Sequence, residues 1–263
     1  MSLKDILVHI DSSPAATARL ALAAALAQRH GAHLIGLQVT DPSDDGSVRG
    51  SAAGTAEAAE ALFSRLTAAA GLSAEFRSLT AAPGTTAGIV KALIRQAHAS
   101  DLVVVSQSRP GSRGAGIAER LILACGRPVL VVPSAGSFPV VGERVLVAWS
   151  SGRGACRALH EALPILRRAA KVTLLEINGK GRVQSGAEDL RDHLARHGVT
   201  ASLERKAPLG AAIGDLLLNR ACDEGDDLLV MGTGNPSSSG SPAIGAVAAQ
   251  ILRQMTIPVL LAY

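Results

Sequence analysis

The sequence has very few aromatic residues, and they occur singly. Aromatics make up 2% of the 263 residues, namely Phe63, Phe76, Phe138, Trp149 and Tyr263. So few rings cannot form the stacking platforms that bind single-stranded nucleic acids. The net charge of +4 comes with arginines scattered along the chain, and no block of like charges occurs. We therefore expect no nucleic-acid partner.

Cysteine and long apolar runs are also scarce. The three cysteines, Cys125, Cys156 and Cys222, are odd in number and far apart, which excludes a disulfide scaffold and fits a reducing compartment. The longest uncharged apolar stretch, residues 20–27, is far shorter than the roughly 20 residues of a membrane span. The chain also starts without a signal-peptide pattern. We therefore expect a cytoplasmic protein with no membrane partner.

Aliphatic residues are abundant, and they follow an internal repeat. Hydrophobic residues make up 48% of the chain, which excludes disorder. The matching segments are Ile6–Ser13 with Val145–Gly152, Asp101–Val105 with Asp227–Met231, and Arg127–Val132 with Ile257–Ala262. A repeat of this length indicates two copies of one structural unit. We predict domains at residues 1–134 and 143–263, joined by a linker at 135–142.

In each copy, short apolar runs alternate with helical patterns. Continuous apolar strands indicate burial on both faces, and hence a parallel sheet. The predicted strands are 5–10, 33–39, 73–80, 101–105, 128–132, 144–149, 171–177, 199–206, 227–231 and 258–262. The predicted helices are 14–30, 55–70, 84–99, 115–125, 153–169, 186–197, 210–223 and 244–254. The expected fold is α/β, with two tandem doubly wound, Rossmann-like domains, each a five-stranded parallel sheet flanked by helices.

Doubly wound sheets bind ligands at the carboxyl ends of their strands, where the strand order reverses. In the second copy the fourth strand leads into a Gly/Ser-rich loop, residues 232–245, and then into a helix. Free N–H groups at a helix start attract anions, so this loop can be a phosphate cradle. The same residues also suit a surface loop, and spacing alone leaves both interpretations open.

The chain resembles the universal stress protein family, in its bacterial tandem form, over essentially all 263 residues. The resemblance is carried by the two-copy layout, the Val/Leu-rich first strand, the Asp-Leu-Leu-Val-Met-Gly segment and the Pro-Val-Leu-Leu segment. It implies a regulatory or protective role in the stress response. It also implies ATP, with Mg²⁺, as the ligand of the members that bind nucleotides, and pairing of domains through their last strands.

The nucleotide motif of the family is only half present. ATP-binding members carry Gly-x2-Gly-x9-Gly followed by Ser, Thr or Gly, and here Gly232 and Gly245 match the first and last glycines. The second glycine is replaced by Asn235, and Ala246 follows the last one. In members that bind nucleotides an acidic residue follows the first strand, and in the second copy Ser150 replaces it.

The resemblance implies a set of nucleotide contacts in the second copy. They are Ala148, Trp149, Ser150, Ile177, Met231, Gly232, Thr233, Gly234, Asn235, Gly245, Ala246 and Val247. The first copy keeps a vestige of the site in Ile10, Asp11 and Val39, but Ser106 and Arg109 replace its first two glycines. Trp149 fits either a ligand contact or an ordinary core residue, and we favour the core.

No catalytic or metal-binding residue is expected. The chain lacks a P-loop, a G-x-S-x-G elbow and an HExxH sequence. His193 and His197 are four residues apart, with Asp189 one turn earlier, a spacing that can bind a metal ion. Arginines flank them, so we favour a solvent-facing helix.

Our leading hypothesis is a non-catalytic stress protein whose degenerate second-domain site binds ATP weakly or not at all. One alternative is a genuine ATP-binding stress protein that uses the second domain. Another is an ATP-using enzyme, a hydrolase or an adenylyl transferase, of the same α/β superfamily. The two copies are expected to pair through strands 128–132 and 258–262 as a dimer within the chain, and a further homodimer is compatible with this arrangement.

Overall fold

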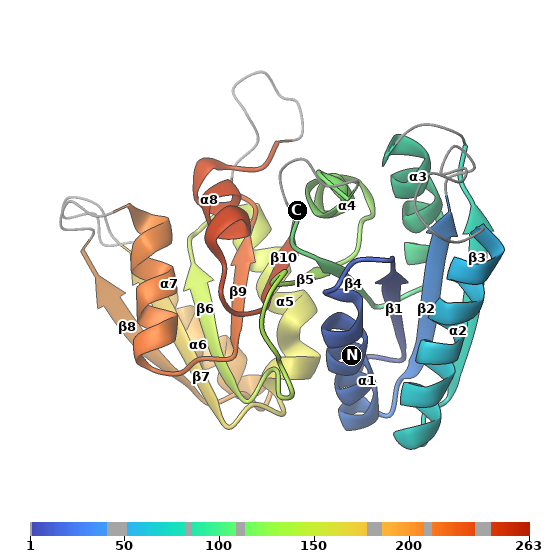
Figure 1. Ribbon diagram of the computed structural model, residues 1–263. Coiled ribbons are helices and arrows are strands. Elements are labelled where there is room, and N and C mark those ends of the chain that lie inside the picture. The colour runs from blue at the N-terminus through green and yellow to red at the C-terminus, as the bar shows by residue number, and fades with distance from the viewer. Residues whose placement is uncertain are drawn as a thin grey trace. The chain divides into compact units, whose positions relative to one another are not determined.

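The chain divides into two compact units, Ser2–Pro139 and Val140–Tyr263 (Figure 1). The computed structural model describes residues 2–40, 52–82, 86–108, 114–177, 186–207, 212–234 and 243–263. The predicted linker, 135–142, spans the division between the units. The proposed domain limits at residues 134 and 143 stay a prediction.

The first unit alternates strands and helices along the chain. Its elements are β1 (Asp5–Ile10), α1 (Ala16–His30), β2 (His33–Thr40), α2 (Ala52–Ala69), β3 (Ala74–Thr80), α3 (Thr86–Ala97), β4 (Leu102–Ser106), α4 (Ile117–Ala124) and β5 (Val129–Val132). The second unit repeats the pattern. Its elements are β6 (Arg144–Trp149), α5 (Arg153–Leu166), β7 (Lys171–Ile177), α6 (Ala187–Arg196), β8 (Ala201–Lys206), α7 (Ile213–Asp223), β9 (Leu228–Gly232), α8 (Ala246–Gln254) and β10 (Val259–Ala262).

Both units have the same strand order. In the first it is β3-β2-β1-β4-β5, and in the second it is β8-β7-β6-β9-β10. The central strand β1 is parallel to both neighbours, with Ile6 facing Leu34 on β2 and Leu102 on β4. The central strand β6 is likewise parallel to β7 and β9. The prediction of two doubly wound parallel α/β units is confirmed, and the order reverses at β1/β4 and at β6/β9.

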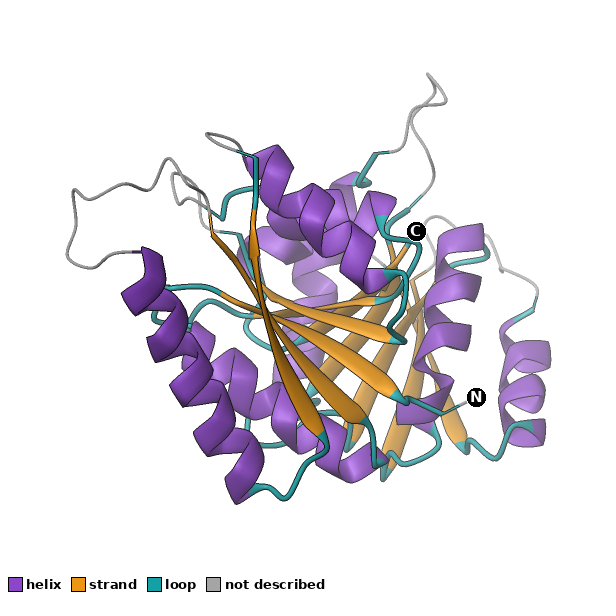
Figure 2. Cartoon of the chain, turned by 90° about the vertical axis from the view of Figure 1, so that its right-hand side faces the viewer, coloured by secondary structure: helices purple, strands orange, loops and turns teal. Residues whose placement is uncertain are grey.

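The strands form the cores because helices cover both sides of each sheet. Figure 2 shows the helices in purple on both sides of the strands. Ile6, Leu7 and Val8 on β1 are completely buried in succession, although side chains on a strand point alternately to opposite faces. Double coverage explains why these strands are continuous apolar runs.

A carboxylate at the start of the fourth strand holds the first strand in place in each unit. Asp101 accepts hydrogen bonds from the backbone N–H groups of Lys4 and Asp5, at 2.6 and 3.0 Å. Its counterpart Asp227 accepts from the backbone N–H groups of three consecutive residues, 142–144. The aspartate shared by the repeated segments 101–105 and 227–231 therefore has a structural role.

The ends of the elements differ from the predicted ranges by at most three residues. The largest shifts occur at helix termini, for example at α2, which starts at Ala52 rather than 55, and at α5, which ends at Leu166 rather than 169. Helix ends are set by local capping and packing more than by apolar periodicity. Among the described helices, none combines the length and apolar character needed to cross a bilayer.

Candidate functional site

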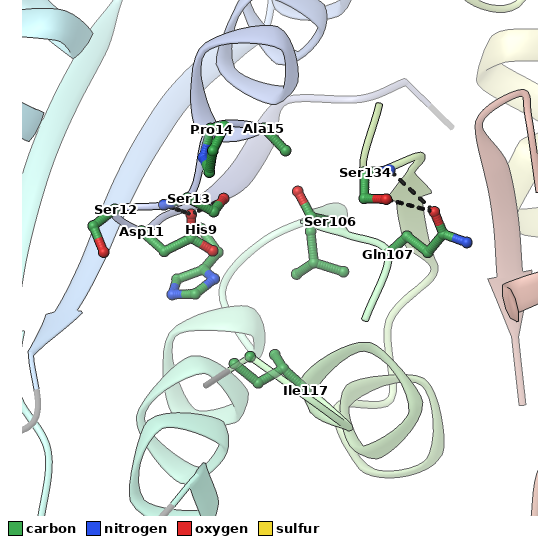
Figure 3. Close-up of a pocket in the computed structure, with 12 residues that line it drawn as sticks. His9, Asp11, Ser12, Ser13, Pro14, Ala15, Ser106, Gln107, Ile117 and Ser134 are labelled. Carbon is green, nitrogen blue, oxygen red and sulfur yellow. Dashed lines mark hydrogen bonds between the residues drawn. The ribbon is translucent and has the colours of Figure 1, made fainter. Parts of the chain in front are cut away.

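A cavity of about 390 Å³ lies in the first unit, at the carboxyl ends of β1 and β4 (Figure 3). Its volume falls in the range of about 300–1,000 Å³ typical of small-molecule sites. The cavity is lined by His9, Asp11, Ser12, Ser13, Pro14, Ala15, Val105, Ser106, Gln107, Gly114, Ile117 and Ser134. The strand order reverses at this point, so the cavity occupies the position at which a doubly wound sheet binds its ligand.

Asp11 follows β1 and is the charged group of the lining. Its Oδ1 accepts hydrogen bonds from the backbone N–H of Ser13 at 3.0 Å, from the Ser13 hydroxyl at 2.5 Å and from Nη2 of Arg19 at 3.0 Å. The two bonds from Ser13 close the turn that leads into α1. The Asp11 side chain remains 32% exposed, so the carboxylate is fixed in position but accessible.

Arg19 lies beneath this carboxylate and is completely buried. Besides its ion pair with Asp11, it donates a hydrogen bond from Nη1 to the hydroxyl of Ser106, the last residue of β4. One guanidinium thus connects the ends of β1 and β4. Its Nε has no hydrogen-bond partner among the described residues, which leaves the ion pair as the main compensation for its burial.

Burial and charge set the protonation of the two titratable lining residues. Burial by itself raises the pKa of Asp11, but the Arg19 charge and the hydrogen bonds outweigh it and hold the pKa well below its usual range. Burial lowers the pKa of His9 to about 4, and the nearby charge of Arg19 adds to this shift. Near neutral pH, Asp11 is therefore ionised and His9 neutral. A carboxylate of such low pKa is a poor general base, so the pair suits binding better than proton transfer.

The opposite wall of the cavity is polar but uncharged. Oε1 of Gln107 accepts hydrogen bonds from the backbone N–H and the hydroxyl of Ser134, both at 3.1 Å. Figure 3 shows Ser106 between this pair and Asp11, with Ile117 across the cavity. Hydroxyls, an amide and a carboxylate beside an apolar patch suit a small polar molecule that also carries an apolar face.

The residues that we expected to bind a nucleotide lie in the second unit, at the matching strand ends. Ala148 and Trp149 end β6 and are half-buried, and Ser150 follows them and is exposed. Ile177, at the end of β7, is half-buried, and Met231 is buried in β9. They have the expected places on the sheet, but a nucleotide contact for them stays a prediction.

The two ends of the predicted phosphate loop meet at the start of α8. The backbone N–H of Gly245 donates to the carbonyl of Thr233 at 2.7 Å, and Gly234 packs beside Gly245. Ala246 and Val247 form the first turn of α8. Thr233 is completely buried, and its Oγ1 has no hydrogen-bond partner in the described ranges. Asn235 lies outside the described residues.

Gly232 packs against the first turn of α5. A Cβ at Gly232 would lie 2.4 Å from both the backbone N of Ala155 and the carbonyl carbon of Gly154. This contact by itself requires glycine, whether or not a ligand binds. The glycine that we interpreted as part of a ligand motif therefore has a packing role.

The start of the helix differs between the two units. In the repeat, Arg153 matches Pro14 and Gly232 matches Ser106. Helix α5 begins at Arg153, whereas α1 begins only at Ala16, two residues further along the repeat. In the first unit the corresponding loop, which includes Pro14, lines the cavity instead of continuing the helix.

Sequence reasoning identified Asp11 but missed the residues around it. Ile10 and Val39, the other residues of the predicted vestige, are buried in their strands. Arg19 is one of the arginines scattered along the chain, and the sequence alone gave it no part in the site. The signal that could have identified it is spacing, because Arg19, Ala23 and Leu26 lie on one helical face that also carries the apolar core.

Comparison with known proteins gives a family and a fold. The model of the universal stress protein family matches residues 2–133. The chain is similar to the crystal structure of a universal stress protein from Archaeoglobus fulgidus, with 16% identity, coverage of 99% and 96% of the two chains, and a TM-score of 0.78. A structure from Pseudomonas aeruginosa, described as a putative universal stress protein, has 18% identity, coverage of 99% and 93%, and a TM-score of 0.64. A universal stress protein in complex with cAMP covers 51% of this chain and 100% of its own, with 20% identity and a TM-score of 0.40. No curated protein matches the sequence significantly.

Proposed function

Because the chain belongs to the universal stress protein family, we propose that it is a non-catalytic regulatory or protective protein of the stress response. Its first domain holds the principal small-molecule site, in the cavity at Asp11. Its second domain keeps a degenerate nucleotide site that binds ATP weakly or not at all. No disulfide bond joins Cys125, Cys156 or Cys222, all of which are described, and this supports a reducing, cytoplasmic setting.

The observation that carries this proposal is the Asp11 carboxylate in an open cavity of the first domain. The second domain has Ser150 at the position of Asp11. A serine hydroxyl accepts a hydrogen bond from a ligand hydroxyl less strongly than a carboxylate does. In addition, the first turn of α5 packs directly on Gly232, and Ala246 has no hydroxyl to offer a phosphate. These differences favour the first domain as the main binding site.

Equilibrium binding of labelled ATP to the full chain, with and without Mg²⁺, tests the proposal. We expect weak binding, which Asp11→Asn abolishes and Thr233→Val leaves unchanged. Adenosine and cAMP serve as additional probes, because they share the nucleoside but carry fewer phosphate charges. Circular dichroism confirms that each variant is folded. Steady hydrolysis of ATP by the wild type would contradict the non-catalytic role.

One observation favours the second candidate, a genuine ATP-binding protein that uses the second domain. The hydrogen bond from Gly245 to Thr233 brings the start of α8 next to Thr233, whose buried hydroxyl has no hydrogen-bond partner among the described residues. A helix start and a hydroxyl together can hold a phosphate. Sub-micromolar ATP binding that is lost in Thr233→Val and retained in Asp11→Asn would establish this candidate and overturn our preference.

A further inference from the structure

Three histidine rings meet in the second domain, between α5 and the end of α6. The rings of His160 and His193 have centroids 5.3 Å apart, and those of His193 and His197 have centroids 4.6 Å apart. The spacing of His193 and His197 was evident in the sequence. The third ring, His160, comes from another helix and was not. We refer to His160, His193 and His197 as the histidine cluster.

His160 presents a free nitrogen lone pair. Its Nδ1 lies 2.8 Å from the carbonyl oxygen of Cys156. Because a carbonyl can only accept a hydrogen bond, Nδ1 carries the proton, and Nε2 of the neutral ring is left with its lone pair. A backbone carbonyl on the remote nitrogen is the outer contact that typically orients a metal-binding histidine.

His193 is the central ring and has an unused nitrogen. Its Nε2 is buried and has no hydrogen-bond partner among the described residues. Burial lowers the pKa of His193, and the neighbouring His197, His160 and Arg196 lower it further. A metal ion binds histidine through the lone pair of an unprotonated ring nitrogen, and the unpartnered Nε2 of His193 is such a position in the neutral ring.

The hydrogen bond of His197 favours the opposite tautomer to that of His160. The Nδ1 of His197 lies 3.2 Å from Nη2 of Arg167, and a guanidinium can only donate. In the neutral ring the proton is then on Nε2. His197 can bind an ion only after it releases Arg167, so it contributes less than the other two rings.

The distances between the rings suit one shared ion. Two imidazoles bound to a tetrahedral zinc ion at about 2.0–2.1 Å have ring centres roughly 5 Å apart. Within the described residues, no three His, Cys, Asp or Glu side chains already form a metal site, so side-chain rotation has to bring the nitrogens together. We propose that the histidine cluster binds a divalent transition-metal ion such as Zn²⁺ through Nε2 of His160 and Nε2 of His193, with His197 as an additional ligand. The ion would tie α5 to α6.

Titration calorimetry of the tag-free full chain with Zn²⁺ tests this proposal. We expect one saturable site per chain. His160→Ala and His193→Ala should each weaken binding by at least about tenfold, the lower end of what removal of even an outer-shell partner costs. His98→Ala, an exposed histidine of the first domain, is the matched control and should bind as the wild type does.

A second measurement does not depend on calorimetry. An ion that binds only the folded state raises the midpoint of thermal unfolding. Zn²⁺ should therefore raise the midpoint for the wild type, for His98→Ala and for Cys156→Ser, but not for His193→Ala. The proposal would be overturned if His193→Ala bound Zn²⁺ as tightly as the wild type. It would also be overturned if Cys156→Ser lost Zn²⁺ binding while His160→Ala retained it.

Discussion

The guanidinium of Arg19 lies 3.0 Å from the carboxylate of Asp11, beneath the cavity of the first domain. Arg19 is fully buried, so the pair is protected from the solvent on one side and faces the cavity on the other. The ion pair keeps Asp11 charged and fixed, and it joins α1 to the ends of β1 and β4 through Ser106. One contact thus serves the stability of the first domain and the shape of its cavity.

Arg19→Met should destabilise the protein by about 2–4 kcal/mol. Removal of one partner of a buried pair typically costs about 3–5 kcal/mol, and the 32% exposure of Asp11 reduces this cost. Urea unfolding measures the effect, with Arg95→Met at an exposed helical position as the control. The double variant Arg19→Met with Asp11→Asn should lose less unfolding free energy than the two single variants lose together. A loss no larger than that of Arg95→Met would show that the pair contributes little.

The buried His9 should make the protein less stable in mild acid. Its pKa is lowered from 6.5 to about 4, so the folded state binds fewer protons than the unfolded state between these values. The free energy of unfolding should therefore fall as the pH drops from 6.5 to 4, by up to about 3 kcal/mol from this group. His9→Gln should flatten the pH dependence in this window and leave the contributions of the other shifted groups, such as His193, Asp226 and Asp227, whereas His98→Ala should not flatten it. An unchanged slope in His9→Gln would contradict the assignment.

Two neighbouring glycines should respond oppositely to alanine. Gly232→Ala introduces a Cβ at 2.4 Å from the backbone of α5 and should cost about 1–3 kcal/mol, as overpacking does. At Gly154, in α5, a Cβ would lie 3.5 Å or more from its neighbours, so alanine fits. There the change should be neutral or stabilising by up to about 1 kcal/mol, because alanine restricts the unfolded chain. Equal stability of the two variants in urea unfolding would contradict the packing role of Gly232.

The single tryptophan should not respond to ATP. Trp149 ends β6 beside Ser150, at the mouth of the site that we consider degenerate. Its fluorescence should stay constant when Mg-ATP is added to the full chain. Labelled nucleotide measures the weak binding that we expect in the first domain. Saturable quenching of Trp149, reversed by Thr233→Val, would show instead that the second domain binds ATP.

Apolar patterning was sufficient to predict the architecture. Continuous apolar runs identified the strands, and the repeat of Asp101 and Asp227 ahead of two of them identified the two units. A central strand that helices cover on both faces needs apolar residues at every position. Such a run can be recognised in the local sequence without knowledge of the tertiary contacts. The position of a ligand site at the strand ends follows from the same topology. The predicted ends of helices differ from the observed ones by up to three residues, since capping and packing set them.

The contents of the sites depended on contacts between elements, which periodicity does not encode. Helical spacing places Arg19 on the apolar face of α1. Nothing local shows, however, that Arg19 pairs with Asp11, that α5 packs onto Gly232, or that His160 meets His193. Each contact depends on the start of a helix and its position over the sheet, and the packing of the whole unit sets both. The sequence alone was therefore enough to predict two doubly wound domains and their strand ends. Only the tertiary structure revealed the cavity in the first domain and the histidine cluster in the second.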